Sequence, residues 1–266
     1  MNSLTGRTIG PYLVQGELGN GGFGCVYYGV DQALNRAVVL KICAAAVSAD
    51  VFREAQLLAE VNHPAVATVY AVFLWDDSPV LVLEYLDRGS LEARLQQGPL
   101  PLHEAERIAQ RVLEGLQAIH GKQILHRDIK AGNIGLTAEG GAKLFDFGIS
   151  KHAQEVTQIL NPDAPLKGTL QCMAPEQLRG LPATVRSEVF SFGVVHYRML
   201  TGLAPFQGDS DAAIYYQVMN GQPRPPAELR PEIPSHVSDA IMKALQREPG
   251  QRFQDTGQYL TALRAG

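Results

Sequence analysis

The sequence predicts an α+β protein with two lobes, a small antiparallel β lobe followed by a larger and mainly helical one. Roughly the first 85 residues contain short runs rich in β-branched and aromatic side chains, as strands do. The rest of the chain carries apolar residues at the 3.6-residue period of helices. A length of 266 residues with 45% apolar content suits a packed core shared by two lobes and argues against wholesale disorder.

The strands of the first lobe are expected at residues 12–19, 25–31, 36–44, 66–75 and 79–86. The last two strands are expected to be buried and joined by a turn at Asp76-Asp77.

A change of period after the third strand predicts a helix over residues 50–62. Asp50 is its candidate cap, and His63-Pro64 is expected to end it. Its apolar stripe is expected to consist of Phe52, Leu57, Leu58 and Val61.

The second lobe is expected to begin near residues 87–90. Helices are predicted at residues 101–121, 186–201, 209–220, 236–246 and 255–264. The proline-rich segment 223–234 is expected to be a surface linker.

Composition excludes several classes of function. The net charge of −4, from 23 basic and 27 acidic residues, argues against nucleic acid as a partner. Cys25, Cys43 and Cys172 are too few and too widely spaced for a disulfide framework or a zinc site, which favours a reducing compartment. We find neither a bilayer-length apolar run nor a signal-peptide pattern, so we expect a cytoplasmic protein without a membrane segment.

The first chemical motif is the glycine-rich run of residues 19–24, Gly-Asn-Gly-Gly-Phe-Gly, which lies between two predicted strands. Glycine lets a backbone turn and approach phosphates without steric cost. The same spacing opens dinucleotide-binding folds, but there a helix follows it, whereas a strand follows here. The alternative is a hairpin turn with surplus glycine.

Lys41 ends the apolar run Ala-Val-Val-Leu-Lys. A cation on a buried strand is costly unless it is paired or bound to an anion, and Glu54 on the next helix is the natural partner. The alternative is an exposed lysine at a strand edge.

Two later motifs supply a base and metal ligands. Residues 126–133 read His-Arg-Asp-Ile-Lys-Ala-Gly-Asn, and Asp146-Phe147-Gly148 follows a short predicted strand. Asp128 can accept a proton from a hydroxyl, while Asn133 and Asp146 offer the hard oxygen ligands that Mg²⁺ prefers. An Asp-Phe-Gly tripeptide alone is most often a turn.

These motifs in this order, completed by Ala174-Pro175-Glu176, resemble the eukaryotic-like (Hanks-type) serine/threonine protein kinases, most closely the bacterial members. The resemblance extends from about Tyr12 to Leu263. It implies one kinase domain over residues 1–266, with an N-lobe at about 1–86, a hinge at about 84–90 and a C-lobe from about 90. It also implies phosphate transfer from Mg-ATP to protein substrates, together with autophosphorylation and a role in signal transduction.

The resemblance assigns roles to individual residues. Asp128 would be the catalytic base, with Lys130 at the γ-phosphate and Lys41 at the α- and β-phosphates, oriented by Glu54. Mg²⁺, with Mn²⁺ as an alternative, would be held by Asn133 and Asp146. ATP would lie among Leu18, Gly19, Asn20, Gly21, Gly22, Phe23, Gly24, Val26, Val39, Lys41, Leu83, Glu84, Leu86 and Gly135, with Leu83 as gatekeeper and the backbone of Glu84 and Leu86 holding adenine.

Other residues are implied to support the site. Glu176 would pair with Arg252, and Phe147 would stack on His126 with Leu58 above. Lys130 and Thr169 favour serine or threonine over tyrosine as the acceptor.

Three positions depart from the family pattern. Val39 replaces an alanine above adenine and Gly135 replaces a large aliphatic residue below it, so we expect a nucleotide site shifted towards the C-lobe. Glu188 replaces an aspartate that braces the backbone of the catalytic loop. Its extra methylene is expected to displace the brace and reduce activity.

The sequence of the activation segment allows more than one kind of regulation. Arg127 and Lys151 resemble a basic pocket for a phosphorylated side chain, for which Thr157 is the nearest candidate. Asp163 as a fixed charge, or two merely solvated cations, are the alternatives.

Two other functions compete with the kinase interpretation. A pseudokinase scaffold usually lacks one of Lys41, Glu54, Asp128, Asn133 and Asp146, which are all present. A small-molecule kinase is disfavoured by Thr169, Arg252 and the Ala-Pro-Glu motif. A homodimer through the N-lobe is a further expectation from the bacterial members.

Overall fold

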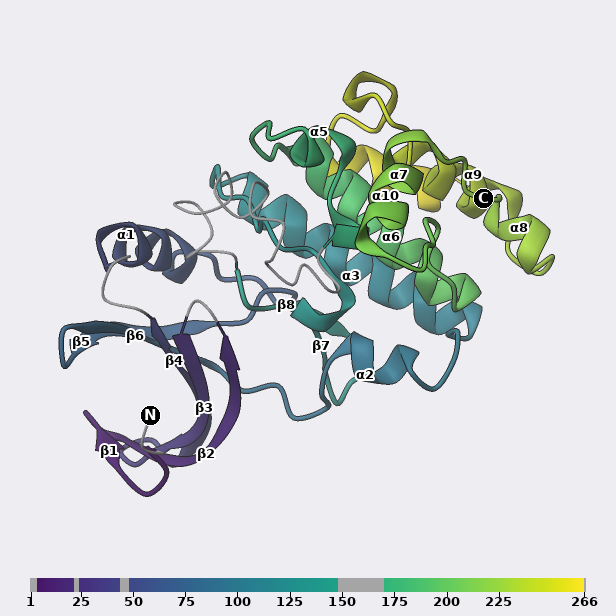
Figure 1. Cartoon of the computed structure of the whole chain (residues 1–266). Helices are drawn as coiled ribbons and strands as arrows, with labels where there is room; N and C mark the ends of the chain where they lie inside the picture. The colour runs from purple at the N-terminus through teal and green to yellow at the C-terminus, as the bar shows by residue number, and fades with distance from the viewer. Residues whose placement is uncertain (1–3, 22–23, 44–47, 148–169, 266) are drawn as a thin grey trace.

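The structure is a computed structural model that describes residues 4–21, 24–43, 48–147 and 170–265. A small lobe of curled β-sheet with one helix adjoins a larger lobe of helices (Figure 1). The predicted α+β class and the two lobes are therefore confirmed. None of the described helices is long and apolar enough to cross a membrane.

The small lobe is built on a six-stranded antiparallel sheet with the order β1-β2-β3-β4-β6-β5. Its strands are β1 (Thr8–Ile9), β2 (Tyr12–Gly21), β3 (Gly24–Asp31), β4 (Arg36–Cys43), β5 (Val69–Trp75) and β6 (Ser78–Glu84). Side chains alternate across β4, so Val38 and Leu40 are fully buried in the apolar cluster of the sheet. Val39 and Lys41 are half-buried on the opposite face.

β5 differs from its prediction as a buried strand. It forms one edge of the sheet, and its residues are half-buried apart from Leu74, which is 58% exposed. The predicted turn is present, because Asp76 and Asp77 have φ angles of 49° and 58°. Two left-handed residues in succession match the twist of a tight hairpin.

The helix of the small lobe is α1 (Ser48–Ala59), which packs against β5 and β6. It begins two residues before the predicted cap Asp50 and ends before His63. Ala55 and Leu58 are buried, but Leu57 is 39% exposed, so its placement on the buried stripe is wrong. Leu57 is rotated about 100° from Leu58 around the helix, away from the sheet.

The large lobe contains the helices α2 (Leu91–Leu95), α3 (Leu102–His120), α5 (Pro175–Leu178), α6 (Val185–Thr201), α7 (Asp211–Asn220), α8 (Pro226–Leu229), α9 (Ser235–Ala244) and α10 (Thr256–Leu263). A short hairpin of β7 (Ile134–Leu136) and β8 (Ala142–Leu144) lies between the helices and the sheet (Figure 1). Most residues of α6 are buried, and α3, α9 and α10 contact it. A capping box at Thr184 begins α6, and Gly202, with φ 73°, ends it in the left-handed region.

The segment 223–234 is more than the predicted surface linker. Pro226 and Ile233 are buried, and α8 packs against α6 and α9. The Arg230 guanidinium also donates to the carbonyl oxygens of Leu100 and Leu200, at 2.7 and 3.0 Å. Proline content favours a break in helices but does not prevent a segment from packing on the core.

Acid should destabilise the protein through His196, which is fully buried in α6. Burial lowers the pKa of His196 from 6.5 to about 3, so between these values the unfolded chain binds a proton that the folded chain excludes. The free energy of unfolding should therefore fall as the pH drops below 6.5, by about 2 kcal/mol at pH 5 from this residue.

Urea unfolding of wild type and His196→Gln at pH 7 and pH 5 measures this effect. Glutamine cannot titrate but can still accept a hydrogen bond from the Tyr259 hydroxyl, which lies 3.1 Å from His196 Nδ1. The variant should lose less stability between the two pH values. Equal losses would show that His196 does not cause the acid sensitivity.

Candidate active site

Asp128 lies in the loop between α3 and β7, where its side chain is 5% exposed and tightly held. Asn133 Nδ2 donates to both the backbone oxygen and Oδ2 of Asp128, each at 2.8 Å. Lys130 Nζ lies 2.8 Å from the same Oδ2. A short 3₁₀ turn, Ala131–Asn133, brings the asparagine back towards the aspartate. The loop therefore presents a fixed carboxylate beside a cation.

A second cation and carboxylate meet between the two lobes. Lys41 Nζ on β4 lies 2.5 Å from Oδ1 of Asp146, which follows β8. The lysine side chain is 13% exposed and the aspartate 42%, so the pair is reachable from solvent on the aspartate side. No local sequence pattern predicts this contact, because the two residues lie 105 positions apart. Glu54 belongs to α1, but its side chain lies outside the described residues.

Asn133 and Asp146 have the chemistry that a magnesium ion requires. The hydrogen bonds of Asn133 to Asp128 use the amide nitrogen, so its amide oxygen is not engaged in them. The Phe145 N–H donates to the Asn133 carbonyl oxygen at 3.0 Å, which holds Asp146 next to this loop. One carboxylate and one amide oxygen fit Mg²⁺, and water and phosphate usually supply its other ligands.

An aromatic stack holds the residues on either side of Asp146. The His126 and Phe147 rings lie 4.4 Å apart at 28°, as predicted, and His126 Nε2 donates to the Phe145 carbonyl at 3.0 Å. His126 is fully buried, and this burial lowers its pKa, so the ring is neutral. Leu58 and Phe147 both line a cavity of about 20 Å³ next to Lys41, which is too small for a nucleotide.

Glu188 braces the catalytic loop directly. Its Oε1 accepts a hydrogen bond of 2.6 Å from the Arg127 backbone N–H, and its Oε2 accepts one of 2.7 Å from His120 Nε2. The prediction that the longer side chain displaces the brace is therefore wrong. The extra methylene lets one buried carboxylate reach both partners, and Arg127 holds the left-handed φ of 63°.

Shortening Glu188 to aspartate should weaken the brace, not repair it. Aspartate is one methylene shorter, so we expect it to lose either the Arg127 N–H or His120, and one buried donor left without a partner costs about 1–3 kcal/mol. We expect Glu188→Asp to lower both the free energy of unfolding and the catalytic turnover. Urea unfolding and single-turnover kinetics measure these quantities, and a rise in turnover would contradict the role of the longer side chain.

The glycine-rich run forms the hairpin between β2 and β3, with Gly19 opposite Val26 and Gly21 opposite Gly24. Gly24 has a φ of 134°, and an added Cβ would lie only 1.9 Å from the Ile42 carbonyl oxygen. Position 24 therefore tolerates glycine alone. Leu18 is 53% exposed on β2, and Gly22 and Phe23 lie outside the described residues.

Val26 and Val39, which are predicted to contact ATP, lie on β3 and on β4, the strand of Lys41. Val26 pairs with Lys41 in register, and Val39 pairs with Leu83. The Leu86 side chain occupies the space beside Gly135, and the shift of the nucleotide site towards the C-lobe stays a prediction. A Cβ on Gly135 would lie 2.2 Å from Leu86 Cδ1.

The chain segment around residue 84 is tied to both lobes by one glutamate. Glu84 Oε1 lies 2.6 Å from Lys143 Nζ on β8, and its Oε2 accepts from the Thr68 N–H at 3.0 Å. Glu84 N–H donates to the Thr68 carbonyl at 2.9 Å. No local sequence pattern predicts this ion pair, because its partners lie 59 positions apart.

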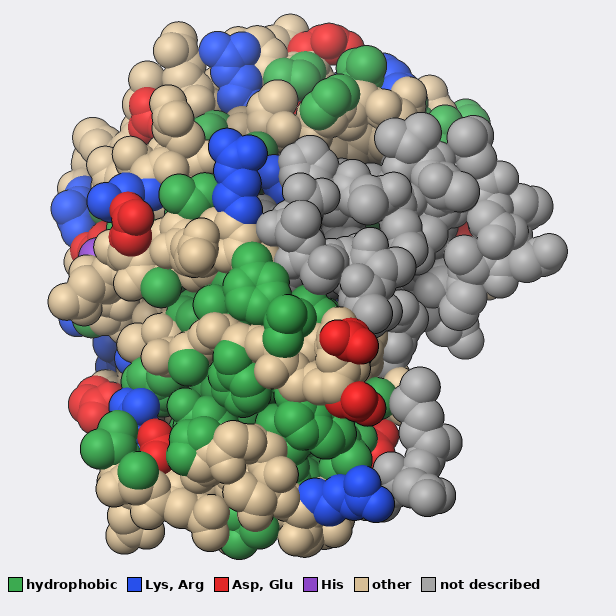
Figure 2. All heavy atoms as spheres, turned by 90° about the vertical axis from the view of Figure 1, so that its left-hand side faces the viewer, with side chains coloured by type: hydrophobic (Ala, Val, Ile, Leu, Met, Phe, Trp, Pro, Cys, Tyr) green, Lys and Arg blue, Asp and Glu red, His purple; other side chains and the backbone are tan. Residues whose placement is uncertain are grey.

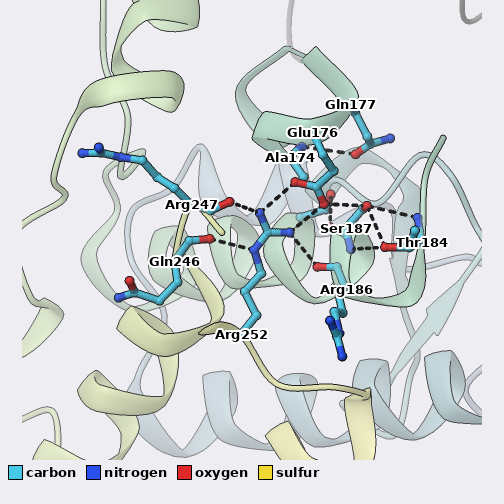
Figure 3. A network of polar contacts seen from close by, with 10 residues as sticks. Ala174, Glu176, Gln177, Thr184, Arg186, Ser187, Gln246, Arg247 and Arg252 are labelled. Atoms are coloured by element: carbon cyan, nitrogen blue, oxygen red, sulfur yellow. Dashed lines mark hydrogen bonds and ion pairs between the residues drawn. The ribbon is translucent and has the colours of Figure 1, made fainter. Parts of the chain in front are cut away.

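The predicted Glu176–Arg252 ion pair is present and joins α5 to the segment before α10 (Figure 3). Two parallel hydrogen bonds of 2.7 and 2.8 Å join the guanidinium to the carboxylate, and Ser187 donates to the same carboxylate at 2.7 Å. Burial alone raises the pKa of Glu176, but the hydrogen bonds from Arg252 and Ser187 outweigh it, and the pKa lies below its usual value. Arg252 also donates to the carbonyls of Arg186, Gln246 and Arg247.

Part of the predicted activation segment lies outside the described residues, namely Gly148, Lys151, Thr157, Asp163 and Thr169. Cys172, which carried no predicted role, lies near the catalytic loop. Burial raises its pKa to about 12, and the Asp128 carboxylate contributes, so its thiol is protonated at neutral pH. A protonated thiol is a poor nucleophile.

The fold has two lobes with the candidate site between them, and comparison with known proteins identifies its family. Residues 12–260 match the family model described as the protein kinase domain. The chain therefore belongs to the protein kinase domain family.

Bacterial serine/threonine kinases are among its relatives. The chain is 34% identical over 270 residues to the probable serine/threonine-protein kinase SCO3848 of Streptomyces coelicolor, covering 97% of this chain and 40% of the relative. It is 34% identical to PknL of Mycobacterium tuberculosis, with 92% and 62% covered, and to PknB of Mycobacterium leprae, with 92% and 41% covered. The chain thus spans about two fifths to three fifths of the length of these relatives.

A solved structure shares the fold. The crystal structure of Rad53 residues 1–466 in complex with AMP-PNP matches 95% of this chain and 64% of its own, with a TM-score of 0.81 and 23% identity. This likeness supports the two-lobed fold.

Proposed function

We propose that the chain is a serine/threonine protein kinase that transfers the γ-phosphate of Mg-ATP to hydroxyl groups of proteins. The observation that carries this proposal is the arrangement of Asp128, held by Asn133 and Lys130, in the same region as the Lys41–Asp146 pair. Family membership and the names of the bacterial relatives support the reaction class.

Each residue has a distinct chemical task in this proposal. Asp128 accepts the proton of the acceptor hydroxyl as its oxygen forms the new bond to phosphorus and the bond to the β-phosphate oxygen breaks. Lys130, 2.8 Å from Asp128, places positive charge beside the transferred group, and Lys41 holds the phosphates that leave.

Magnesium, when bound at Asn133 and Asp146, neutralises charge on the phosphates. Lys41 lies against the Asp146 carboxylate, so its ammonium group is already placed next to the proposed metal ligand. Glu54 is proposed to orient the lysine.

Phosphate incorporation from labelled ATP tests the proposal directly. The purified chain should label itself and a generic protein substrate on serine or threonine, and both signals should disappear with EDTA and in Asp146→Asn. Thermal stabilisation by Mg-ATP without any incorporation would instead support the pseudokinase alternative. Transfer to small molecules but not to proteins would support a small-molecule kinase.

Autophosphorylation is proposed at Thr157, with Arg127 and Lys151 as the cations that receive the phosphate. Arginine pairs with phosphate more strongly than with a carboxylate such as Asp163. Mass mapping of the active protein should find phosphate at Thr157, and an active protein without modification there would rule the site out.

A second copy of the chain is proposed as a partner of the small lobe. Figure 2 shows apolar side chains gathered on the side of the small lobe where β5 lies, and Leu74 of that strand is 58% exposed. β5 is an edge strand of the sheet and consists of apolar residues. Leu74→Lys should shift a dimer to monomer in light scattering, and a wild-type chain that is monomeric at all concentrations would refute the dimer.

A further inference from the structure

We propose that the side chain of Leu86 replaces the missing side chain at position 135 and supplies the floor of the pocket for the nucleotide base. The inference rests on the proposed function, because it concerns the base of ATP. It adds that one hinge residue determines the shape of the base site, and that Gly135 is glycine because Leu86 needs its space.

The present position of the Leu86 side chain leaves no room for a side chain at position 135. A Cβ built on Gly135 would lie 2.2 Å from Leu86 Cδ1, 3.2 Å from its Cβ and 3.3 Å from its Cγ. Separations below 3.0 Å between such atoms do not occur in proteins, so even alanine at 135 requires Leu86 to move. All three of the nearest atoms belong to Leu86, so its side chain occupies the space next to Gly135.

The backbone holds Leu86 in this place. The chain after the hinge runs beside β7, where Ser90 bridges to Gly135 and the Leu136 N–H donates to the Gly89 carbonyl at 2.9 Å. These contacts hold the segment that follows Leu86 against β7. A rotation of its side chain would open the floor without any change in the fold.

The partner of Gly135 across the hairpin confirms which face is involved. Gly135 and Lys143 are opposite in register, so their side-chain positions share one face of β7 and β8. Lys143 extends from that face to Glu84, at 2.6 Å. Glu84 and Leu86 therefore contact the same face of the hairpin. Glu84 forms an ion pair with Lys143, and Leu86 makes an apolar contact with Gly135.

The opposite side of the site is formed by the sheet. Val39 is half-buried on the face that carries Lys41, and it pairs in register with Leu83 just before the hinge. Two aliphatic side chains, Val39 from the sheet and Leu86 from the hinge, suit a planar aromatic base. Apolar contact with both faces of the base would supply affinity, while hinge backbone groups would select adenine.

Nucleotide affinity of three variants tests this floor. Leu86→Ala should weaken binding of Mg-AMP-PNP by about tenfold, because a loss near 1.4 kcal/mol of apolar contact corresponds to that factor. Gly135→Leu should weaken it similarly, because the new side chain collides with Leu86. The double variant Leu86→Ala/Gly135→Leu should recover affinity to within about threefold of wild type, because the floor is then rebuilt from β7.

Controls separate the floor from general damage. Thermal unfolding without nucleotide reports folding of each variant, and Leu181→Ala, at a leucine that is 56% exposed outside the site, should bind as wild type does. Unchanged affinity of Leu86→Ala, or additive losses in the double variant, would overturn the inference while leaving the kinase proposal intact. A wild-type chain that binds no adenine nucleotide would overturn both.

Discussion

Replacement of Asp128 by asparagine should lower the rate of phosphate transfer by about 10²–10⁴-fold, the usual contribution of a positioned base. Asparagine has nearly the same shape but cannot accept the proton of the acceptor hydroxyl. The buried loop should keep its conformation, because the Asn133 amide still donates to the backbone oxygen of residue 128 at 2.8 Å. Nucleotide affinity should therefore stay within a few-fold of wild type.

Single-turnover transfer from labelled ATP, together with nucleotide titration, measures the two quantities separately. Asp239→Asn, at an exposed aspartate of α9, provides the matched control and should transfer phosphate normally. Loss of both transfer and binding in Asp128→Asn would indicate that the loop had collapsed. Retention of full transfer would show that another group accepts the proton.

The second large effect is on stability, at the buried ion pair. Arg252→Met should lower the free energy of unfolding by about 3–5 kcal/mol, because it leaves the buried Glu176 carboxylate without its cation. The double variant Arg252→Met/Glu176→Gln should recover part of this loss, since the uncompensated charge is gone. Recovery should be incomplete, because three backbone carbonyls lose the guanidinium that bonds them.

Urea unfolding of the single and double variants measures these losses. The exposed pair of Arg224 and Glu228, whose side chains are 66% and 59% exposed at 3.8 Å, offers the comparison. Arg224→Met should change the free energy of unfolding by less than about 1 kcal/mol. Equal effects at both pairs would show that burial does not govern the contribution of Arg252.

Local sequence patterns predict most of the helices and strands correctly. The helix predicted over residues 186–201 is α6 (Val185–Thr201), because its apolar residues and its capping residues lie within one segment. The errors arise where burial is decided by distant residues. Leu57 has an apolar side chain at a plausible spacing, but the direction of the sheet relative to α1 places it outside.

In the candidate site, too, sequence reasoning located local motifs but missed some contacts between distant residues. Motif order located Asp128, Asn133 and Asp146, and the structure brings the first two into direct contact. Sequence reasoning did not find that Lys41 meets Asp146, since their separation of 105 residues gives no local signal. It also misjudged Glu188, because a departure from a pattern does not show which new partner the longer side chain reaches.

The close approach of Gly135 and Leu86 also limits the evolutionary paths open to this chain. A mutation at position 135 to any larger residue meets Leu86, since a Cβ there would lie 2.2 Å from Leu86 Cδ1. Leu86 Cδ1 is the end of a flexible side chain, so a larger residue at 135 fits only if the side chain of residue 86 rotates away or is shortened. Substitutions at the two positions are therefore expected to be epistatic, with the effect of each depending on the residue at the other.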